Sequence, residues 1–457
     1  MSGKIRNILV RAIVNVCRMI LAATFIFSGF VKANDPYGTA YKLQDYLTAF
    51  GFADIPNFLV FAMAVVVAMV EFTMGIYLLF GISRSAISKL VLFFMSFMTL
   101  LTVYIYIYDP VKDCGCFGDA IVLTNFETLL KNIVLLGAAV VLVRKPEHQV
   151  EFVSSNFAWL VSLYAVVFVL GFSVACIRNL PFIDYRPFHI GANIREAVEL
   201  PDSLMPVYEA RIVYERNGER LELLPEDDDP DSTWTYVETT RKLVKAGGVP
   251  DVQNLYMEDP QSDFDLSEMI LEDEGYTFLL ISPNLKNADD SNVDLINEAY
   301  DYAVEKGYAF YCLTASDSTD RQYWVEHTGA EYGFLRSDEL TLKTIVRSNP
   351  GLVLMRNGVI VNKWSSFDLP DEYELNGRLE DIPAGKIHYV PLERKLAYVL
   401  MLFFVPLFVL TLLDRMAMGW SFYRRMKRKT EEKTEELNLD EIEKNIHNTF
   451  NSKNKEK

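Results

Sequence analysis

The sequence predicts a multi-pass α-helical membrane protein that also carries an exported α/β domain. The chain has 457 residues, of which 51% are hydrophobic. Runs of about 20 apolar residues are long enough to cross a hydrocarbon core of roughly 30 Å. About six such spans occur, near residues 12–31, 57–81, 87–108, 121–143, 157–178 and 396–413. Residues 182–394 are polar with short alternating apolar runs, which is typical of a folded domain outside the membrane.

Basic residues between the predicted spans indicate how the chain crosses the membrane. If the chain crosses the membrane six times, all of its basic clusters fall on one side. These clusters are Lys4 with Arg6 and Arg11, Arg84 with Lys89, Arg144 with Lys145, and the run from Arg415 to Lys429. Because loops rich in Lys and Arg stay in the cytoplasm, this side is predicted to be cytoplasmic. No small-residue cleavage site follows the first span, so we expect a retained helix there.

The acidic charge of the chain lies in the predicted outside domain. Residues 183–394 have a net charge of −23, whereas the rest of the chain has a net charge of +6. An acidic domain of this kind is unsuited to nucleic acid, so we expect no nucleic-acid partner. The partners that we do expect are the lipid bilayer and an exported client protein.

Two of the five cysteines lie in the short loop after the third span. They are Cys114 and Cys116, separated by Gly115. A disulfide between cysteines this close closes a small, strained ring, and strained disulfides are labile and suit exchange reactions. Two structural thiols or two metal ligands are the alternatives. Few histidines occur and none is near the loop, so we expect no metal.

The other three cysteines are predicted to have separate roles. Cys17 lies within the first span and is expected to pack as a small apolar residue. Cys312 lies in an apolar strand and is expected to be buried. Cys176 stands at the outer end of the fifth span, at a depth similar to the cysteine loop. We therefore expect Cys176 to be a third thiol that resolves or accepts the disulfide.

Charged residues inside the predicted spans indicate a second functional element. Glu71 falls near the middle of the second span, Arg18 in the inner half of the first, and Lys131 near the middle of the fourth. Such charges cost roughly 3 kcal/mol to insert and are usually paired or functional. We expect Glu71 to pair with Arg18 or Lys131. The pair is either a proton or quinone site or an ion pair that specifies helix packing.

The polar domain divides into two predicted parts. The first, residues 182–270, is β-rich, with a hairpin of 210–216 and 219–224 around Asn217-Gly218, and a further strand at 232–244. Trp234 and Tyr236 are expected to share one face of that strand. In the second part, strands are predicted at 276–281 and 308–313, helices at 292–306, 321–327 and 338–346, and a hairpin at 351–364.

The order of these elements in residues 271–390 resembles a thioredoxin-like domain of the peroxiredoxin/TlpA type. Pro350 stands where that fold has a cis-proline, and Pro250-Asp251 would lead into the domain. Thioredoxins place Cys-X-X-Cys directly after a core strand. Here the corresponding residues, 282–286, read Ser-Pro-Asn-Leu-Lys. We therefore expect this domain to bind or present a client and to have no dithiol exchange of its own.

Residues 9–145 resemble the DoxX/MauE group of bacterial membrane proteins. The motifs that carry the resemblance are Ser-Gly-Phe-Val-Lys at 28–32 with Asp35-Pro36, the segment 71–75 that begins with Glu71, and Asp-Cys-Gly-Cys-Phe-Gly at 113–118. The resemblance implies a four-helix membrane bundle in the bacterial inner membrane, with residues 182–394 in the periplasm. MauE proteins are implicated in disulfide formation during maturation of a periplasmic enzyme. DoxX is associated with a quinone-linked sulfur oxidoreductase, which makes quinone the cofactor to expect.

Three functions follow from this organisation. The first is an inner-membrane thiol–disulfide oxidoreductase or relay that acts through Cys114 and Cys116, with Glu71 moving the proton. The second is a non-enzymatic scaffold that displays a thioredoxin-like binding domain. The third is a small-solute transporter that uses Glu71. The predicted parts are the bundle 1–150, the fifth helix 151–181, the β-rich region 182–270, the thioredoxin-like domain 271–390, the sixth helix 391–415 and a cytoplasmic tail 416–457.

Overall fold

The computed structural model divides the chain into two compact units. The membrane unit is Met1–Ser173 with Leu392–Lys457, and the α/β unit is Val174–Pro391. The structure describes residues 3–453 except 53, 112–113, 199–206, 217–218, 226, 228–229, 231–232, 246–251 and 253–254. The combination of membrane helices with an α/β domain is the predicted fold class.

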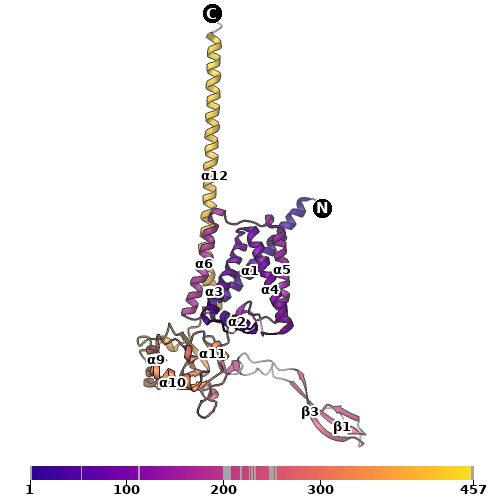
Figure 1. The fold of residues 1–457 in the computed structure, drawn as a ribbon, viewed down its shortest axis with the longest axis vertical. Helices are drawn as coiled ribbons and strands as arrows, with labels where there is room; N and C mark the ends of the chain where they lie inside the picture. Colours follow the sequence, from indigo (N-terminus) through magenta and orange to yellow (C-terminus); the bar gives the residue numbers. More distant parts are fainter. Residues whose placement is uncertain are drawn as a thin grey trace. The chain divides into compact units, whose positions relative to one another are not determined.

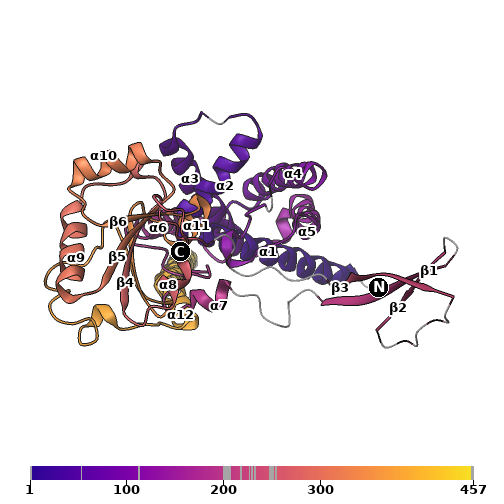
Figure 2. The same cartoon turned by 90° about the horizontal axis from the view of Figure 1, so that it is seen from below.

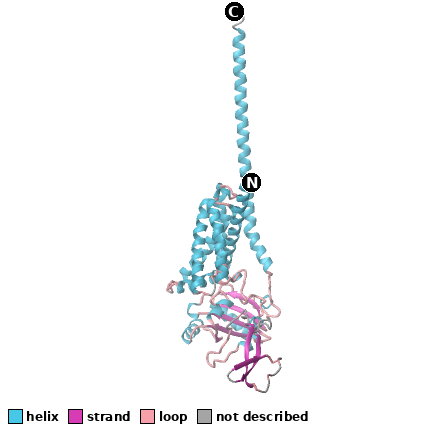
Figure 3. Cartoon of the chain, turned by 90° about the vertical axis from the view of Figure 1, so that its right-hand side faces the viewer, coloured by secondary structure: helices cyan, strands magenta, loops and turns pink. Residues whose placement is uncertain are grey.

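The membrane unit consists of helices, as Figures 1 and 3 show. Six helices in the described residues are long and apolar enough to cross a membrane, which confirms the number predicted. The helices that carry them, together with the short helix α2, are α1 (Gly3–Asn34), α2 (Pro36–Ala49), α3 (Asn57–Phe80), α4 (Arg84–Tyr108), α5 (Asn125–Arg144), α6 (Ser155–Arg178) and α12 (Leu392–Lys453). Helix α12 continues past its apolar segment and includes the tail.

Two glycines allow α1 and α3 to pack with their backbones close together. A Cβ on Gly29 would lie 2.4 Å from the backbone N of Phe72, and a Cβ on Gly75 would lie 2.6 Å from the backbone N of Ile26. Small residues at such contacts are a common way to join membrane helices, because backbones can approach without side chains between them. The close packing brings the Ser28 side of α1 against Glu71 of α3.

Helix α2 is an element that sequence reasoning missed. It begins directly after α1, where the Asp35 side chain accepts a hydrogen bond from the backbone N of Gly38 at 2.9 Å. Pro36 occupies the first turn, where its missing N–H costs nothing. Buried Ala40 packs with Val60 and Ala64 of α3. This short helix therefore closes the end of the bundle at which α1 finishes.

The opposite end of the bundle gathers arginines around the α5–α6 connection. Arg84 donates to Gln149 O at 2.8 Å, and Arg415 donates to Phe152 O at 3.0 Å. Arg18 donates to Val150 O and lies over the Phe152 ring. Arg84 and Arg415 were both used to predict the cytoplasmic side. They share one end of the membrane unit, as six crossings require.

The α/β unit is built on a five-stranded sheet with the order β6-β5-β4-β7-β8. Its strands are β4 (Tyr276–Ser282), β5 (Ala309–Thr314), β6 (Gly333–Arg336), β7 (Gly351–Arg356) and β8 (Val359–Ser365). Strands β4, β5 and β6 are parallel, whereas β7 pairs antiparallel with both β4 and β8. The Asn349–Pro350 peptide before β7 is cis. This topology is thioredoxin-like, and Pro350 occupies the predicted position.

Helices cover both faces of this sheet (Figure 2). Every residue of β4 is buried, as expected of a central strand with both faces covered. One core contains Ile296 of α9 and Trp324 of α10; the other contains Ile194 of α7, Ile270 of α8 and Leu342 of α11. The helix bounds are α7 (Ile194–Val198), α8 (Ser267–Leu271), α9 (Val293–Lys306), α10 (Ser318–Thr328) and α11 (Glu339–Ile345).

A separate three-stranded antiparallel sheet, in the order β2-β1-β3, carries the predicted hairpin. Its strands are β1 (Val207–Arg216), β2 (Glu219–Leu223) and β3 (Thr235–Lys245). The hairpin pairing is confirmed, although its Asn217-Gly218 turn lies outside the described residues, as does Pro250-Asp251. The strand β3 begins at Thr235, one residue after Trp234, so the shared face of Trp234 and Tyr236 stays a prediction. Arg216 lies over the Trp234 ring, 4.6 Å from its centroid.

Candidate functional site

The cysteine loop follows α4 and brings its two thiols into contact. Cys114 Sγ and Cys116 Sγ lie 3.0 Å apart, which is a hydrogen-bond contact and not the roughly 2.05 Å of a covalent disulfide. Gly115 and Gly118 have φ values of +64° and +52°. Because side chains rarely adopt such angles, the two glycines allow the chain to turn around the cysteine pair. The motif residue Asp113 lies outside the described residues.

Aromatic side chains hold the loop against the bundle. The Tyr46 hydroxyl of α2 donates to Cys114 O at 2.9 Å. The Phe117 ring packs edge-on against Phe27 of α1, with centroids 5.3 Å apart. The Lys131 ammonium of α5 lies over the same Phe117 ring, 4.1 Å from its centroid. The loop is therefore fixed by contacts from three helices.

A buried charge cluster lies directly beneath Cys116. Lys32 Nζ is 2.8 Å from Glu71 Oε2, 2.7 Å from Ser28 Oγ and 2.8 Å from Cys116 O. An ammonium has three N–H donors, so each of these acceptors can receive one. Ser28 Oγ in turn lies 2.7 Å from Glu71 Oε2 and 2.6 Å from Cys116 O. Lys32 and Glu71 are only 8% and 4% exposed.

The predicted partners of Glu71 were wrong. Glu71 forms its ion pair with Lys32, whereas Arg18 donates to Val150 O and Lys131 contacts the Phe117 ring. The first span was predicted to end near residue 31, so Lys32 was placed at its edge. Helix α1 in fact continues to Asn34 and carries Lys32 on its last turn. The four-residue spacing of Ser28 and Lys32 places both on one face, and this was the signal available.

The two cysteines differ in their electrostatic surroundings. The Cys114 S–H donated to Cys116 Sγ lowers the pKa of Cys116 to about 6, and the charges of Lys131 and Lys32 act in the same direction. Burial and the charge of Glu71 oppose this shift. The same sulfur contact, together with burial, raises the pKa of Cys114 above that of an ordinary thiol. The charges around the pair therefore favour a thiolate at Cys116.

The other three cysteines have different local surroundings. Cys17 is partly buried and packs against the apolar core of the bundle. Cys312 of β5 is fully buried, and burial raises its pKa. Cys176 is buried near the end of α6, in the part of the helix that belongs to the α/β unit. Its role as a third thiol stays a prediction.

The α/β unit has a polar network where thioredoxins carry their cysteines. Ser282 Oγ donates to Asn349 Oδ1 at 2.8 Å, and Asn349 Nδ2 donates to Asn284 O at 2.8 Å. The backbone N of Asp289 donates to Asn349 O at 2.8 Å. The carbonyl before the cis-proline is thus already bonded within the chain. Dithiol exchange cannot occur at residues 282–286, because none of them is a cysteine.

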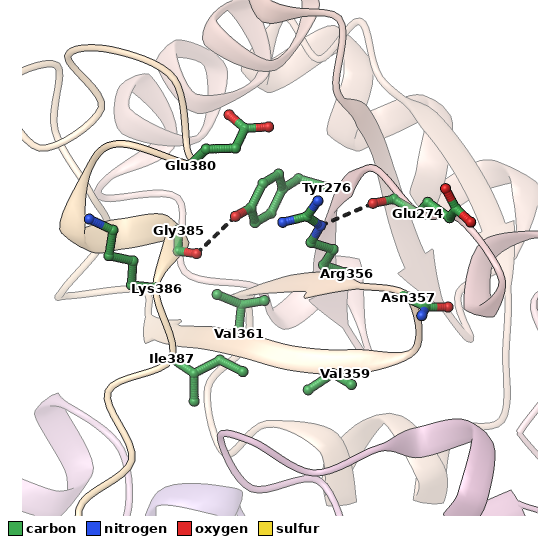
Figure 4. Close-up of a pocket in the computed structure, with 10 residues that line it drawn as sticks. All are labelled: Glu274, Tyr276, Arg356, Asn357, Val359, Val361, Glu380, Gly385, Lys386 and Ile387. Atoms are coloured by element: carbon green, nitrogen blue, oxygen red, sulfur yellow. Dashed lines mark hydrogen bonds between the residues drawn. The ribbon is translucent and has the colours of Figure 1, made fainter.

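An open cavity of about 710 Å³ lies elsewhere in the α/β unit, beside the β7–β8 hairpin (Figure 4). Arg356 lies over the Tyr276 ring, 4.9 Å from its centroid, and donates to Glu274 O at 3.0 Å. Across the cavity are Glu380 and Lys386. The lining therefore combines both signs of charge with an aromatic face, and contains no cysteine.

Two family models match parts of the chain. Residues 10–145 match the family described as methylamine utilisation protein MauE. Residues 208–246, which hold most of the three-stranded sheet, match a domain of unknown function, DUF8463. No curated protein matches the chain.

Several solved structures resemble the chain. One is the thioredoxin domain of a thiol-disulfide oxidoreductase from Bacteroides vulgatus, with 14% identity, a TM-score of 0.21, and coverage of 24% of this chain and 83% of that one. Another is described as a thiol:disulfide interchange protein DsbE from Chlorobium tepidum, with 14% identity, a TM-score of 0.22, and coverage of 32% and 94%. A third is the mitochondrial 2-Cys peroxiredoxin from Plasmodium falciparum, with 15% identity, a TM-score of 0.19, and coverage of 27% and 86%.

These TM-scores are low, so the thioredoxin-like assignment rests on the strand order, the strand directions and the cis-proline at Pro350. The family match is of a different kind, because it covers the four helices of the bundle and the cysteine loop in one segment. Ser28, Lys32, Glu71 and the cysteine pair all fall inside it. Residues 10–145 of this chain are therefore similar to MauE proteins over one continuous membrane segment.

Proposed function

We propose that the protein is a thiol–disulfide oxidoreductase or redox relay of the bacterial inner membrane that acts on an exported protein. The observation that carries this proposal is the contact between Cys114 Sγ and Cys116 Sγ at 3.0 Å, in a loop between two membrane helices. The loop rests on the buried Lys32–Glu71 pair. A thiol with a lowered pKa beside a second thiol is the usual arrangement for exchange.

The exchange balances without any further reactant. The thiolate of one loop cysteine attacks a client disulfide, so one S–S bond forms to the client and the client's own S–S bond breaks. The other loop cysteine gives up its proton and attacks this mixed disulfide, which closes the Cys114–Cys116 bond and releases the second client thiol. The client gains two electrons and the pair loses two. The reverse sequence transfers a disulfide to the client.

The basic end of the bundle supports an orientation of the chain in the membrane. Arg84 and Arg415 lie together at the α5–α6 connection, and this end would face the cytoplasm. The cysteine loop follows the opposite end of α4 and would face the periplasm. An oxidising space is where disulfides persist. The acidic residues 183–394 would lie in the same space.

Three further roles belong to this proposal. A membrane quinone is the acceptor that would restore the oxidised pair, since the loop lies next to the membrane spans. Glu71 would take up or pass on a proton released when thiols oxidise. Cys176 would accept the disulfide from the loop. Each role is separable by mutation from the exchange itself.

The test is to trap the exchange in cells. Cys114→Ser and Cys116→Ser are made singly, and cells are quenched in acid and alkylated before non-reducing electrophoresis. One of the two variants should accumulate as a reducible, higher-mass adduct with an exported protein, because it can attack but cannot resolve. Cys17→Ser is the matched control and should form no adduct. No adduct in either loop variant would overturn the exchange function.

The cavity beside Arg356 favours a second candidate, a scaffold that binds a partner through the thioredoxin-like domain. Its Arg356, Lys386 and Glu380 side chains provide charges of both signs for a polar ligand. An Arg356→Gln/Lys386→Gln variant separates the candidates. If it abolishes function in cells while Cys114→Ser/Cys116→Ser has no effect, the scaffold is the correct function.

A further inference from the structure

We propose that Cys116 is the attacking thiol of the pair, that Cys114 is the resolving thiol, and that Lys32 and Lys131 are positioning residues for the Cys116 thiolate. This inference rests on the exchange function proposed above and assigns the order of its two steps. It depends on three features of the loop: unequal exposure of the cysteines, unequal backbone anchoring, and unequal charge.

Exposure distinguishes the two cysteines. Taken as whole residues, Cys116 is half-buried, whereas Cys114 is only 7% exposed. A client disulfide must approach one sulfur along the axis of its S–S bond, so it needs an accessible thiolate. The second step takes place inside the mixed disulfide and needs only a neighbouring thiol. Cys114 Sγ at 3.0 Å from Cys116 Sγ meets this second requirement.

Backbone anchoring places Cys116 over the charge cluster. Its carbonyl oxygen receives Lys32 Nζ at 2.8 Å and lies 2.6 Å from Ser28 Oγ. Cys114 is held differently, through the Tyr46 hydroxyl on its carbonyl at 2.9 Å. Lys32 is itself fixed by Glu71, so its ammonium cannot swing away without leaving a buried carboxylate unpaired. Thus α1 and α3 together hold the Cys116 backbone.

Positive charge surrounds Cys116 from two sides. Lys32 approaches from α1, and Lys131 of α5 lies over the ring of the next residue, Phe117. Among the described residues, the groups near the pair include Lys32 of α1, Tyr46 and Lys42 of α2, Glu71 of α3, and Lys131 of α5. Lys32 is paired with Glu71. A thiolate at Cys116 adds a negative charge between Lys32 and Lys131, and both lysines favour it.

The order of the steps follows. The Cys116 thiolate attacks the client disulfide and one client thiolate leaves, so the sulfur loses its negative charge as the new S–S bond forms. The positive charge of Lys131 then favours ionisation of Cys114, whose proton leaves to water or to the departing thiolate. The Cys114 thiolate attacks Cys116 Sγ and expels the second client thiolate. Two electrons pass from the pair to the client.

The experiment measures thiol ionisation and needs no client. The full chain in detergent micelles, with Cys17, Cys176 and Cys312 replaced by Ser, is alkylated with iodoacetamide over pH 5–10 in Cys114→Ser and Cys116→Ser backgrounds. Cys116 should react faster than Cys114 at pH 7, because Lys32 and Lys131 lie beside it and favour its thiolate. Lys32→Met and Lys131→Met should each slow Cys116 alkylation at pH 7 by roughly tenfold and leave its rate at pH 10 unchanged. Lys89→Met, the same change on an exposed residue of α4, should have no effect.

A second variant distinguishes the loss of the Lys32 charge from a failure of Lys32→Met to fold. Lys32→Met/Glu71→Gln removes both charges, leaves no ion unpaired, and should still slow Cys116 alkylation. Lys32→Arg keeps the charge and should restore most of the rate. Equal pH profiles for the two cysteines, or a Cys116 profile that the lysine variants do not move, would overturn this inference. An adduct in cells that forms with Cys116→Ser and not with Cys114→Ser would reverse the order while leaving the exchange function intact.

Discussion

Lys32 Nζ and Glu71 Oε2 lie 2.8 Å apart in the buried contact between α1 and α3. Both residues are needed to keep the contact neutral, and Ser28 Oγ accepts a hydrogen bond from Lys32 and donates one to Glu71. A buried ion pair adds little compared with an apolar pair of similar size, but the loss of one partner leaves an uncompensated charge. The pair therefore ties the cysteine loop to the integrity of the bundle.

The first prediction concerns this ion pair. Glu71→Leu should destabilise the membrane unit by about 3–5 kcal/mol, because it leaves the Lys32 ammonium buried without its carboxylate. Lys32→Met/Glu71→Leu should recover most of that loss. The measurement is thermal unfolding in detergent micelles. A single variant as stable as wild type would show that water reaches Lys32 and that the pair is not buried.

A second prediction uses the glycines between α1 and α3. Gly29→Ala should destabilise the bundle by about 1–3 kcal/mol, since its Cβ would meet the Phe72 backbone N at 2.4 Å and the helices must separate. Gly137→Ala in α5 is the matched control, because no atom lies within 4 Å of its Cβ. Unfolding in the same micelles distinguishes the two. Equal stability of both variants would mean that α1 and α3 do not pack this closely.

A third prediction concerns acid stability of the α/β unit. Burial tends to raise the pKa of Asp184, but Lys363 and Arg186, both 2.9 Å from its carboxylate, hold the pKa well below the usual value. A carboxyl with a depressed pKa stabilises the fold above its unfolded pKa of about 3.9, and this stabilisation is lost as pH falls further. Asp184→Asn should therefore lower the free energy of unfolding by about 3–5 kcal/mol at pH 7. It should also make the stability of the unit depend less on pH below pH 4.

Hydrogen–deuterium exchange of peptides from β8 measures this local stability, since Lys363 lies on that strand. Asp290→Asn is the control, because its ion pair with His327 is about half exposed and such pairs contribute little. A variant at Asp184 with unchanged exchange at pH 7 would contradict the prediction.

A fourth prediction concerns which residues face outward. Val122→Cys and Tyr373→Cys, in a chain without its native cysteines, should react with a membrane-impermeant maleimide in intact cells, because both positions are exposed. Arg424→Cys in the tail should react only after the cells are opened. Labelling of Arg424→Cys in intact cells would place the cysteine loop on the reducing side and remove the basis for exchange.

Much of the fold could be predicted because its signals are local. The apolar runs that became α3 to α6 are each about 20 residues or more, and the Asn349-Pro350 step before a hydrophobic strand marked the start of β7. Helix α2 was missed because its 14 residues mix aromatic and polar side chains without a clear apolar face. Strand β6 was missed because it has only four residues, and its place in the sheet depends on its pairing with β5.

The site could be predicted only in part for a related reason. The cysteine motif and Glu71 stand out in the sequence because cysteines this close, and carboxylates in a membrane span, are rare. The partner of Glu71 depends on which helices are neighbours, and that is set by Gly29 and Gly75 rather than by charge. Lys32 at the end of a span has the position of a lysine that extends to the membrane surface. Only the structure shows that the Lys32 side chain points into the bundle, toward Glu71.

The central claim is that Cys114 and Cys116 cycle between dithiol and disulfide. The most direct measurement is their redox state in intact cells, fixed by acid quenching and scored by a mass-tagged maleimide on the full chain. We predict that both states are present, that an impermeant reductant shifts the pair to the dithiol, and that Cys114→Ser/Cys116→Ser abolishes the chain's function in a deletion strain. A pair that stays in one state under all conditions, together with full complementation by the double variant, would contradict the account.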